Sequence, residues 1–278
     1  MLKTRVVTAV FLFAAFFSAL FYLPPLGWAL FATVVATLAA WEWGALMGWG
    51  GWPRVALGGA LAAICLLLGV LEPGALGMGP ASADDAWRLG RWFYLPAAAF
   101  WGLLVPVWMK RRWPLPKSAI GLLIGAVLIL PTWLALVQLR QVGAQALLAI
   151  MAVVWLADIA AYFSGRAFGK HKLAPAISPG KTWEGAIGAG IGVLIYGLAL
   201  SPSLPALLAA NVWVLIAVLI LLTIVSIIGD LFESLLKRQA GLKDSSNILP
   251  GHGGVLDRID SLTSTLPLVA LVWLGILH

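Results

Sequence analysis

Long apolar stretches recur along the whole chain, separated by short segments that carry most of the charged residues. Nine of these stretches are close to the length, about 20 apolar residues, that crosses a bilayer core as a helix. They cover residues 6–23, 26–47, 55–71, 91–109, 118–139, 143–163, 183–200, 206–228 and 262–277. Hydrophobicity is continuous within each stretch, whereas a transmembrane β-strand alternates over about ten residues. The pattern therefore predicts an all-α polytopic membrane protein with about nine transmembrane helices.

The composition supports this fold class and excludes others. Of the 278 residues, 62% are hydrophobic and 10% are charged, whereas about a quarter of a soluble domain is charged. The 15 Trp and 30 Gly residues are typical of membrane helices, and Trp is expected mainly at the interfaces. The single cysteine, Cys65, excludes an intramolecular disulfide. The net charge of +7 does not indicate nucleic acid, because basic residues gather in the cytoplasmic loops of membrane proteins.

The basic residues predict the orientation of the chain in the membrane. With nine spans, the N-terminus shares one side with the second, fourth, sixth and eighth connections. That side carries 15 of the 18 basic residues, which are Lys3, Arg5, Arg54, Lys110, Arg111, Arg112, Lys117, Arg166, Lys170, Lys172, Lys181, Lys237, Arg238, Lys243 and Arg258. The other side carries Arg88, Arg91 and Arg140 with the acidic residues Glu72, Asp84 and Asp85. The positive-inside rule therefore predicts a cytoplasmic N-terminus and an external C-terminus at His278.

The polar residues divide the chain, which we interpret as a single membrane domain over residues 1–278, into two parts. Residues 1–142 are mostly hydrophobic scaffold. Seven of the 11 acidic residues follow position 157, so we expect residues 143–278 to be the catalytic part, with cytoplasmic loops at 164–182 and 231–261. The first span resembles a signal peptide, but no small-residue cleavage site follows it, and we expect it to be a retained helix.

A polar helix face is predicted to continue the eighth span out of the membrane. Its side chains recur at helical spacing, at Asp230, Glu233, Ser234 and Lys237. Gly241 is expected to end this helix. A carboxylate at the end of a long apolar run is costly without a partner, which favours a functional role for Asp230. The same reasoning applies to Asp158, which also follows a long apolar run.

A glycine-rich turn at 250–254 follows this helix and precedes two more carboxylates. Glycine lets backbone N–H groups in such a turn approach a phosphate closely. Asp257 and Asp260 come next and share a face if the ninth helix has begun. Carboxylates suit a hard cation such as Mg²⁺, and Lys and Arg suit phosphate oxygens, so the stretch indicates a nucleotide or pyrophosphate site. The alternative, a solvated loop whose basic residues only set the orientation, does not explain the carboxylate of Asp230.

These residues resemble the signature of the phosphatidate cytidylyltransferases, also called CDP-diacylglycerol synthases. The resemblance covers 27 residues at matching spacing, from Ser234 through the segment LPGHGG at 249–254 to Asp260. Segments 158–166 and 178–185 look like the other polar segments of that family. The resemblance implies that CTP and phosphatidic acid react to give CDP-diacylglycerol and pyrophosphate in a bacterial inner membrane. It also implies a homodimer.

The resemblance further implies roles for individual side chains. Those expected in catalysis are Asp230, Lys237, Arg238, Lys243, Asp244, Asp257, Arg258 and Asp260. Three of them, Asp230, Asp257 and Asp260, are expected to hold Mg²⁺, and a second cation remains open. Those expected to bind substrate are Asp158, Ser178, Lys181, Thr182, Glu184, Ser234, His252, Gly253 and Gly254.

The segment before the seventh span has two local interpretations. The tripeptide GKT at 180–182 resembles the end of a P-loop, but Pro175 stands where the P-loop requires glycine and a membrane span follows. We expect instead that Ser178 caps a helix and that Pro179 occupies its first position. Positions 181 and 184 would then share a helix face.

Other functions remain open on the residues alone. A CTP-dependent polyprenol or phytol kinase would require a base to activate a lipid hydroxyl group. An ion-coupled transporter using Asp158 and Asp230 would predict inverted repeats, and no clear repeat is visible. An intramembrane aspartyl protease would require these two carboxylates to share a proton, although basic residues surround Asp230. For Glu42, near the end of the second span, a functional and a structural role are equally open.

Overall fold

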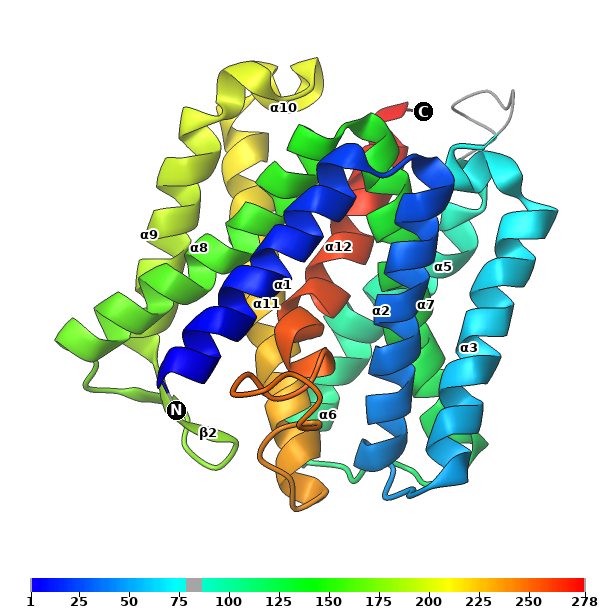
Figure 1. The fold of residues 1–278 in the computed structure, drawn as a ribbon. Coiled ribbons are helices and arrows are strands. Elements are labelled where there is room, and N and C mark those ends of the chain that lie inside the picture. The colour runs from blue at the N-terminus through cyan, green and yellow to red at the C-terminus, as the bar shows by residue number, and fades with distance from the viewer. Residues whose placement is uncertain (1, 79–86, 278) are drawn as a thin grey trace.

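The computed structural model describes residues 2–78 and 87–277, and helices dominate it (Figure 1). Seven helical segments among these residues are long and apolar enough to cross a membrane. They are α1 (Leu2–Tyr22), α2 (Pro25–Leu46), α3 (Trp52–Leu71), the unit of α5 (Gly90–Ala99), a π-helical turn (Phe100–Leu104) and α6 (Val105–Arg111), α7 (Ala119–Val142), α8 (Ala144–Phe168) and α11 (Val212–Gln239). The prediction of an all-α, multi-pass membrane protein is confirmed.

Two further apolar helices coincide with the remaining predicted spans. α9 (Trp183–Ala199) is apolar but has only 17 residues. α12 (Leu256–Leu277) begins before residue 262, so Asp257 and Asp260 lie in its first turns and share a face, as expected. This helix lies in the middle of the bundle, against α2, α5, α7, α8 and α11 (Figure 1). Short 3-10 helices lie at Pro73–Leu76 and Ser201–Ser203.

The start of the eighth predicted span, 206–228, is wrong. A separate short helix, α10 (Ala206–Ala210), occupies its first residues, and α11 begins only at Val212. Asn211 between them is extended, and its side-chain oxygen accepts hydrogen bonds from the backbone N–H groups of residues 213 and 214, at 3.1 and 3.3 Å. This N-cap defines the start of α11, because it satisfies donors that lack an intrahelical partner.

Regular structure also extends into the two predicted loops. α8 covers the first residues of 164–182, and an antiparallel hairpin of β1 (Lys172–Ala174) and β2 (Ser178–Thr182) covers most of the rest. In the second loop, α11 continues through the polar face that the sequence predicted, and Gly241 follows its end with φ 71°. The segment between α11 and α12 is therefore 240–255, which is shorter than the predicted 231–261.

Tryptophan contributes to the core as well as to the interfaces. Trp28, Trp43, Trp101 and Trp133 are fully buried. Each indole N–H donates a hydrogen bond of 2.9–3.0 Å to an oxygen of another helix. A buried indole N–H requires such an acceptor, so these bonds fix how the helices pack. The expectation that Trp is mainly interfacial therefore misses the part that Trp plays in the core.

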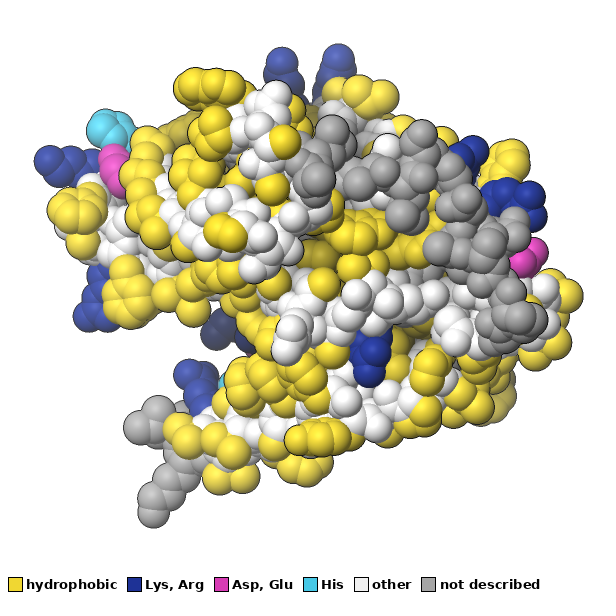
Figure 2. All heavy atoms as spheres, turned by 90° about the horizontal axis from the view of Figure 1, so that it is seen from above, with side chains coloured by type: hydrophobic (Ala, Val, Ile, Leu, Met, Phe, Trp, Pro, Cys, Tyr) yellow, Lys and Arg dark blue, Asp and Glu magenta, His cyan; other side chains and the backbone are white. Residues whose placement is uncertain are grey.

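The outside of the bundle is apolar. Large hydrophobic side chains are exposed on several helices, including Phe11 at 70%, Trp92 at 79%, Ile195 at 66% and Trp213 at 76% (Figure 2). Contiguous apolar surface of this kind is unfavourable in water. It matches the hydrocarbon core of a bilayer, where the backbone groups of helices are satisfied internally.

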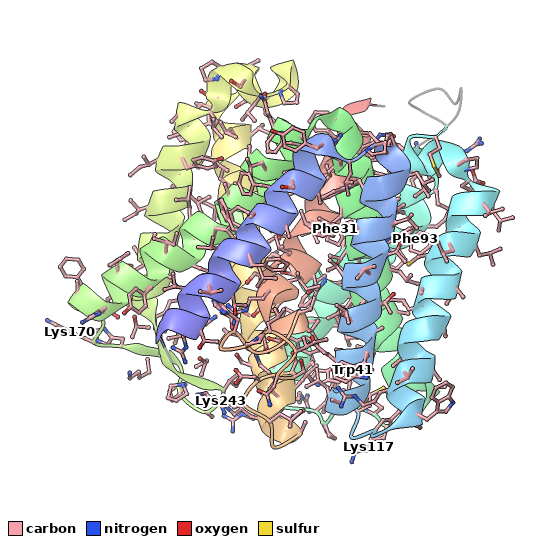
Figure 3. All side chains as sticks on the ribbon, in the orientation of Figure 1. Phe31, Trp41, Phe93, Lys117, Lys170 and Lys243 are labelled. Atoms are coloured by element: carbon pink, nitrogen blue, oxygen red, sulfur yellow. The ribbon has the colours of Figure 1, made fainter. Side chains whose placement is uncertain are left out.

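The polar segments gather at one end of the bundle, which we call the polar end. It comprises the N-terminus, the β1–β2 hairpin and the segment 240–255, whereas α10 and the end of α12 lie at the opposite end (Figure 1). Lys117, Lys170 and Lys243 also lie at the polar end (Figure 3). Three residues used to predict the orientation, Asp84, Asp85 and His278, lie outside the described residues.

Candidate functional site

A buried ammonium group connects α11 to α12 at the polar end. Lys237 Nζ lies 2.7 Å from Glu233 Oε2 and 2.6 Å from Asp257 Oδ1. The three side chains are only 12%, 6% and 3% exposed. Buried charges are stable only when paired, so the lysine and the two carboxylates require one another. The sequence placed Lys237 on the same helix face as Glu233, but not its partner Asp257.

Asp257 also organises the segment 240–255. Its Oδ2 accepts hydrogen bonds from Gly254 N at 2.7 Å, from Ser245 N at 2.9 Å and from Ser245 Oγ at 3.0 Å. A methyl group on Gly253 would come within 2.7 Å of the same oxygen, which explains the need for glycine there. Both carboxylate oxygens of Asp257 therefore already have partners. The residue makes structural contacts that its expected role as a metal ligand did not include.

Glu42 is a second organiser of this segment, and it comes from the part of the chain predicted to be scaffold. The side chain is fully buried in α2 and accepts four hydrogen bonds. The donors are Ser245 Oγ at 3.1 Å, Ser246 Oγ at 2.6 Å, Val255 N at 2.9 Å and Leu256 N at 2.6 Å. Since Leu256 starts α12, Glu42 satisfies N–H donors at that helix start from another part of the chain. A side chain on Gly254 would overlap Glu42.

A second ion pair joins the hairpin to α11. Lys181 Nζ in β2 contacts Asp230 Oδ2, and Ser234 Oγ donates to Asp230 Oδ1 at 3.3 Å. Asp230 also interacts electrostatically with Asp158 of α8 and Asp260 of α12. Three helices therefore direct carboxylates toward one region, and the hairpin supplies a lysine. The structure thus brings together five residues expected in the site, which are Asp158, Lys181, Asp230, Ser234 and Asp260.

The expected helix cap at Ser178 is wrong. Ser178 lies in β2, where it pairs with Ala174, and the backbone remains extended to Thr182. The hydroxyl oxygen of Thr182 accepts a hydrogen bond from Gly185 N at 3.1 Å, so Thr182 is the N-cap of α9. Ser-Pro is a favourable start of a helix, but pairing with β1 holds this segment as a strand. The residues at 181 and 184 therefore do not share a helix face.

An open cavity of about 430 Å³ lies beside the segment 240–255. Its lining residues are Arg5, Lys243, Asp244, Asn247, Gly251, His252, Gly253 and Arg258. The Nδ1 atom of His252 is buried and has no hydrogen-bond partner in the part of the chain that the structure describes. Arg258 also interacts electrostatically with Asp158, which connects the cavity to the carboxylate group. Three basic side chains against one acidic side chain suit a polyanion.

Some expected site residues belong neither to the carboxylate group around Asp230 nor to the cavity lining. Arg238 is exposed in the last turn of α11 and does not line the cavity. Glu184 binds the hairpin instead: its carboxylate accepts from His171 N at 3.2 Å and lies 2.7 Å from His171 Nδ1. Thr182 acts as a helix cap. The structure thus separates these three side chains from the cavity that collects Lys243, His252 and Arg258.

The carboxylates at the polar end are the side chains that could hold a metal ion. Among residues 2–78 and 87–277, no group of three or more His, Cys, Asp and Glu side chains is placed to hold a metal ion. Mg²⁺, however, usually takes only one or two protein carboxylates and completes its shell with water and substrate phosphates. Asp230 pairs with Lys181 and Asp257 pairs with Lys237, so each carboxylate lies where a cation is favourable. The carboxylates therefore fit a Mg²⁺ ion shared with substrate phosphates.

Comparison with known proteins shows the family of this chain. The model of a cytidylyltransferase family matches residues 3–274. A phosphatidate cytidylyltransferase of Pseudomonas aeruginosa is 44% identical over 282 residues, covering 98% of this chain and 97% of the relative. One of Haemophilus influenzae is 35% identical over the full length of both chains, and one of Brucella suis is 47% identical over 61% of this chain and 60% of the relative. This chain therefore belongs to the cytidylyltransferase family.

Proposed function

We infer that this chain transfers the cytidylyl group of CTP to phosphatidic acid and so forms CDP-diacylglycerol and pyrophosphate. The observation that carries the inference is similarity along nearly the whole chain to phosphatidate cytidylyltransferases. The structure adds a basic cavity and a carboxylate group at one end of an apolar bundle, where a soluble nucleotide and an insoluble lipid can meet. The kinase and transporter alternatives are not favoured, because the similarity covers the whole chain and not only a nucleotide motif. The test is which part of CTP the lipid acquires.

The reaction needs charge neutralisation more than it needs a strong base. An oxygen of the lipid phosphate forms a bond to the α-phosphorus of CTP, and the bond from that phosphorus to the β-phosphate breaks. Pyrophosphate leaves with the bonding electrons. The nucleophile is already an anion, so the main barrier is the approach of two negatively charged groups. We assign Lys243 and Arg258 to the phosphates in the cavity, with His252 as a further donor.

We propose that Asp230, Asp257 and Asp260 hold Mg²⁺, and that Asp158, which interacts electrostatically with Asp230, is a candidate ligand of a second cation. When bound, the ion would neutralise charge on the triphosphate. Asp257 differs from the other two because it also anchors segment 240–255 through Gly254 and Ser245. Its replacement is therefore expected to disturb both the segment and the metal, whereas replacement of Asp230 isolates the electrostatic role.

We propose that the polar end faces the cytoplasm, where CTP is present, in a bacterial inner membrane. Support comes from the unequal distribution of Lys and Arg and from the position of Lys117, Lys170 and Lys243 at this end (Figure 3). We also propose a homodimer, on the family resemblance alone. Light scattering of the purified protein, corrected for bound detergent, tests the oligomeric state. A measured mass equal to that of a single chain would contradict the proposed homodimer.

The proposed orientation predicts which residues an impermeant thiol reagent labels. In a Cys65→Ala background, Asn247→Cys is expected to react only after the cell membrane is opened, because segment 240–255 would be cytoplasmic. A cysteine added after His278 is expected to react in intact cells, because the C-terminus would be external. Gel-shift labelling measures both. Labelling of both positions in intact cells, or of neither, would contradict the proposed orientation.

A further inference from the structure

The N-terminal half of α1 extends over the polar end with little support from the bundle. Its C-terminal half is anchored, since Leu20 is buried and Arg140 Nε donates to the Leu20 carbonyl oxygen at 2.7 Å. In contrast, Val7 is 68% exposed and Val10 is 63% exposed. The helix crosses the front of the bundle diagonally, and its N-terminus lies beside the hairpin and segment 240–255 (Figure 1). The position of its N-terminal half therefore depends on the few contacts that this half makes with the polar end.

The first such contact is between Arg5 and the glycine-rich turn. Gly251 has φ +77°, and a methyl group placed on it would lie 2.8 Å from Arg5 Cγ and 3.6 Å from Arg5 Cα. Glycine at this position thus serves two purposes, because it allows the left-handed backbone and admits the arginine of α1. The turn and α1 are close at this point, although Arg5 and Gly251 lie near opposite ends of the sequence.

The second observation is the charge of the cavity that Arg5 and Gly251 line. Arg5 lines it together with Lys243 and Arg258, while Asp244 is the only acidic side chain in the described lining. Nδ1 of His252 is buried there without a partner. A volume of about 430 Å³ lies within the usual range for small-molecule sites, and the charge balance favours an anion.

We propose that Arg5 is a substrate-binding residue whose guanidinium group binds a phosphate of one substrate in this cavity. The proposal rests on the proposed function for the identity of the ligand. On the sequence alone Arg5 contributes only to the predicted orientation, since it lies far from the signature residues. A guanidinium group presents paired donors to phosphate oxygens and remains charged at any relevant pH. The phosphate belongs to CTP or to phosphatidic acid, and the two substrates are separated by the experiment.

Steady-state kinetics of Arg5→Gln test the proposal. A charge-assisted hydrogen bond contributes about 1.5–3 kcal/mol, so we expect KM for one substrate to rise about 10- to 100-fold while kcat changes less. A rise in KM for CTP identifies the nucleotide as the ligand, and a rise in KM for phosphatidic acid identifies the lipid. Arg5→Lys is expected to fall between the two proteins, because the charge remains but the paired donors are lost.

Two control variants separate binding from other effects of a lost charge. Arg111→Gln makes the same change at an exposed position of α6, outside the cavity lining, and is expected to retain wild-type KM values. The double variant Thr4→Lys/Arg5→Gln keeps the basic residue at the membrane edge but moves it around the helix by about 100°. It is expected to keep the wild-type orientation and the raised KM, which excludes a topological cause.

A binding measurement distinguishes failure of this proposal from failure of the proposed function. Titration calorimetry with inorganic pyrophosphate requires no turnover, and Arg5→Gln is expected to bind about tenfold more weakly than wild type if Arg5 contacts the nucleotide phosphates. An inactive wild-type protein that still shows this difference would refute the proposed reaction and retain the role of Arg5. The role of Arg5 is refuted if Arg5→Gln matches wild type in both KM values and in pyrophosphate binding, including the case in which neither protein binds it.

Discussion

Asp230→Asn is expected to lower turnover of CTP by at least about 10²- to 10³-fold while the protein remains folded. The amide keeps the shape of the side chain but loses the charge that pairs with Lys181 and that would hold a hard cation. Loss of one fixed electrostatic contact in an active site costs about 10²–10³ in rate, and loss of a metal ligand is expected to cost at least as much. The Lys181–Asp230 pair is 27% exposed on each side, so its loss should cost less stability than the loss of a fully buried ion pair.

A double-mutant cycle tests whether Asp230 acts through its charge. Lys181→Met alone is expected to reduce turnover, and adding it to Asp230→Asn is expected to cost little more, because the first change has already broken the pair. Ser234→Ala separates the charge from the hydrogen bond, since it removes the 3.3 Å hydrogen bond to Asp230 but leaves the carboxylate charged, and it should cost less than Asp230→Asn. Activity of Asp230→Asn near the wild-type level at ordinary Mg²⁺ concentration would show that the assignment is wrong.

Glu42→Gln is expected to reduce both stability and activity strongly, although Glu42 lies in the hydrophobic first part of the chain. Its carboxylate accepts four hydrogen bonds, and in the variant an amide NH₂ group would face donors where an acceptor is required. Each buried donor left unsatisfied costs about 1–3 kcal/mol. Since these donors include Ser245 and Ser246, the segment that carries Lys243 and His252 should lose its position, and KM should rise.

The measurements are the thermal unfolding midpoint in detergent and the kinetics at saturating lipid. Glu72→Gln makes the same chemical change at an exposed position outside the polar end and is the matched control. Ser246→Ala should lower activity less in the Glu42→Gln background than in wild type, because the amide then faces one donor fewer. Equal effects of Ser246→Ala in the two backgrounds would show that Glu42 does not position the segment.

The sequence predicts the helices better than it predicts their connections. Continuous hydrophobicity identifies the spans because a bilayer imposes their length and apolar character. The predicted span beginning at residue 183 coincides with the start of α9, but the hairpin before it was not predicted, because Ser178-Pro179 is a favourable local helix start and only pairing with β1 shows the strand. The separate helix α10 is not predicted, because its residues are as apolar as those of α11. The apolar pattern alone does not show that Asn211 caps a new helix.

The candidate site shows the same limit for side chains. The polar helix face and the signature together predict Asp230, Lys237, Asp257 and Asp260, because these residues lie in one stretch of the sequence and recur at helical spacing within each helix. Glu42 and Arg5 reach the same site from more than 200 positions away, and a pattern of neighbours cannot place them. The only indication in the sequence was a carboxylate within an apolar span, which generally requires a partner.

The fate of the phosphates of CTP tests the proposed reaction most directly. Purified protein is supplied with phosphatidic acid, Mg²⁺ and CTP labelled either at the α-phosphate or at the γ-phosphate. The account predicts that the α-label enters the lipid product, that the γ-label leaves as pyrophosphate, and that both events stop when a chelator removes the metal. Entry of the γ-label into the lipid would instead show a kinase reaction and would contradict the proposed cytidylyl transfer.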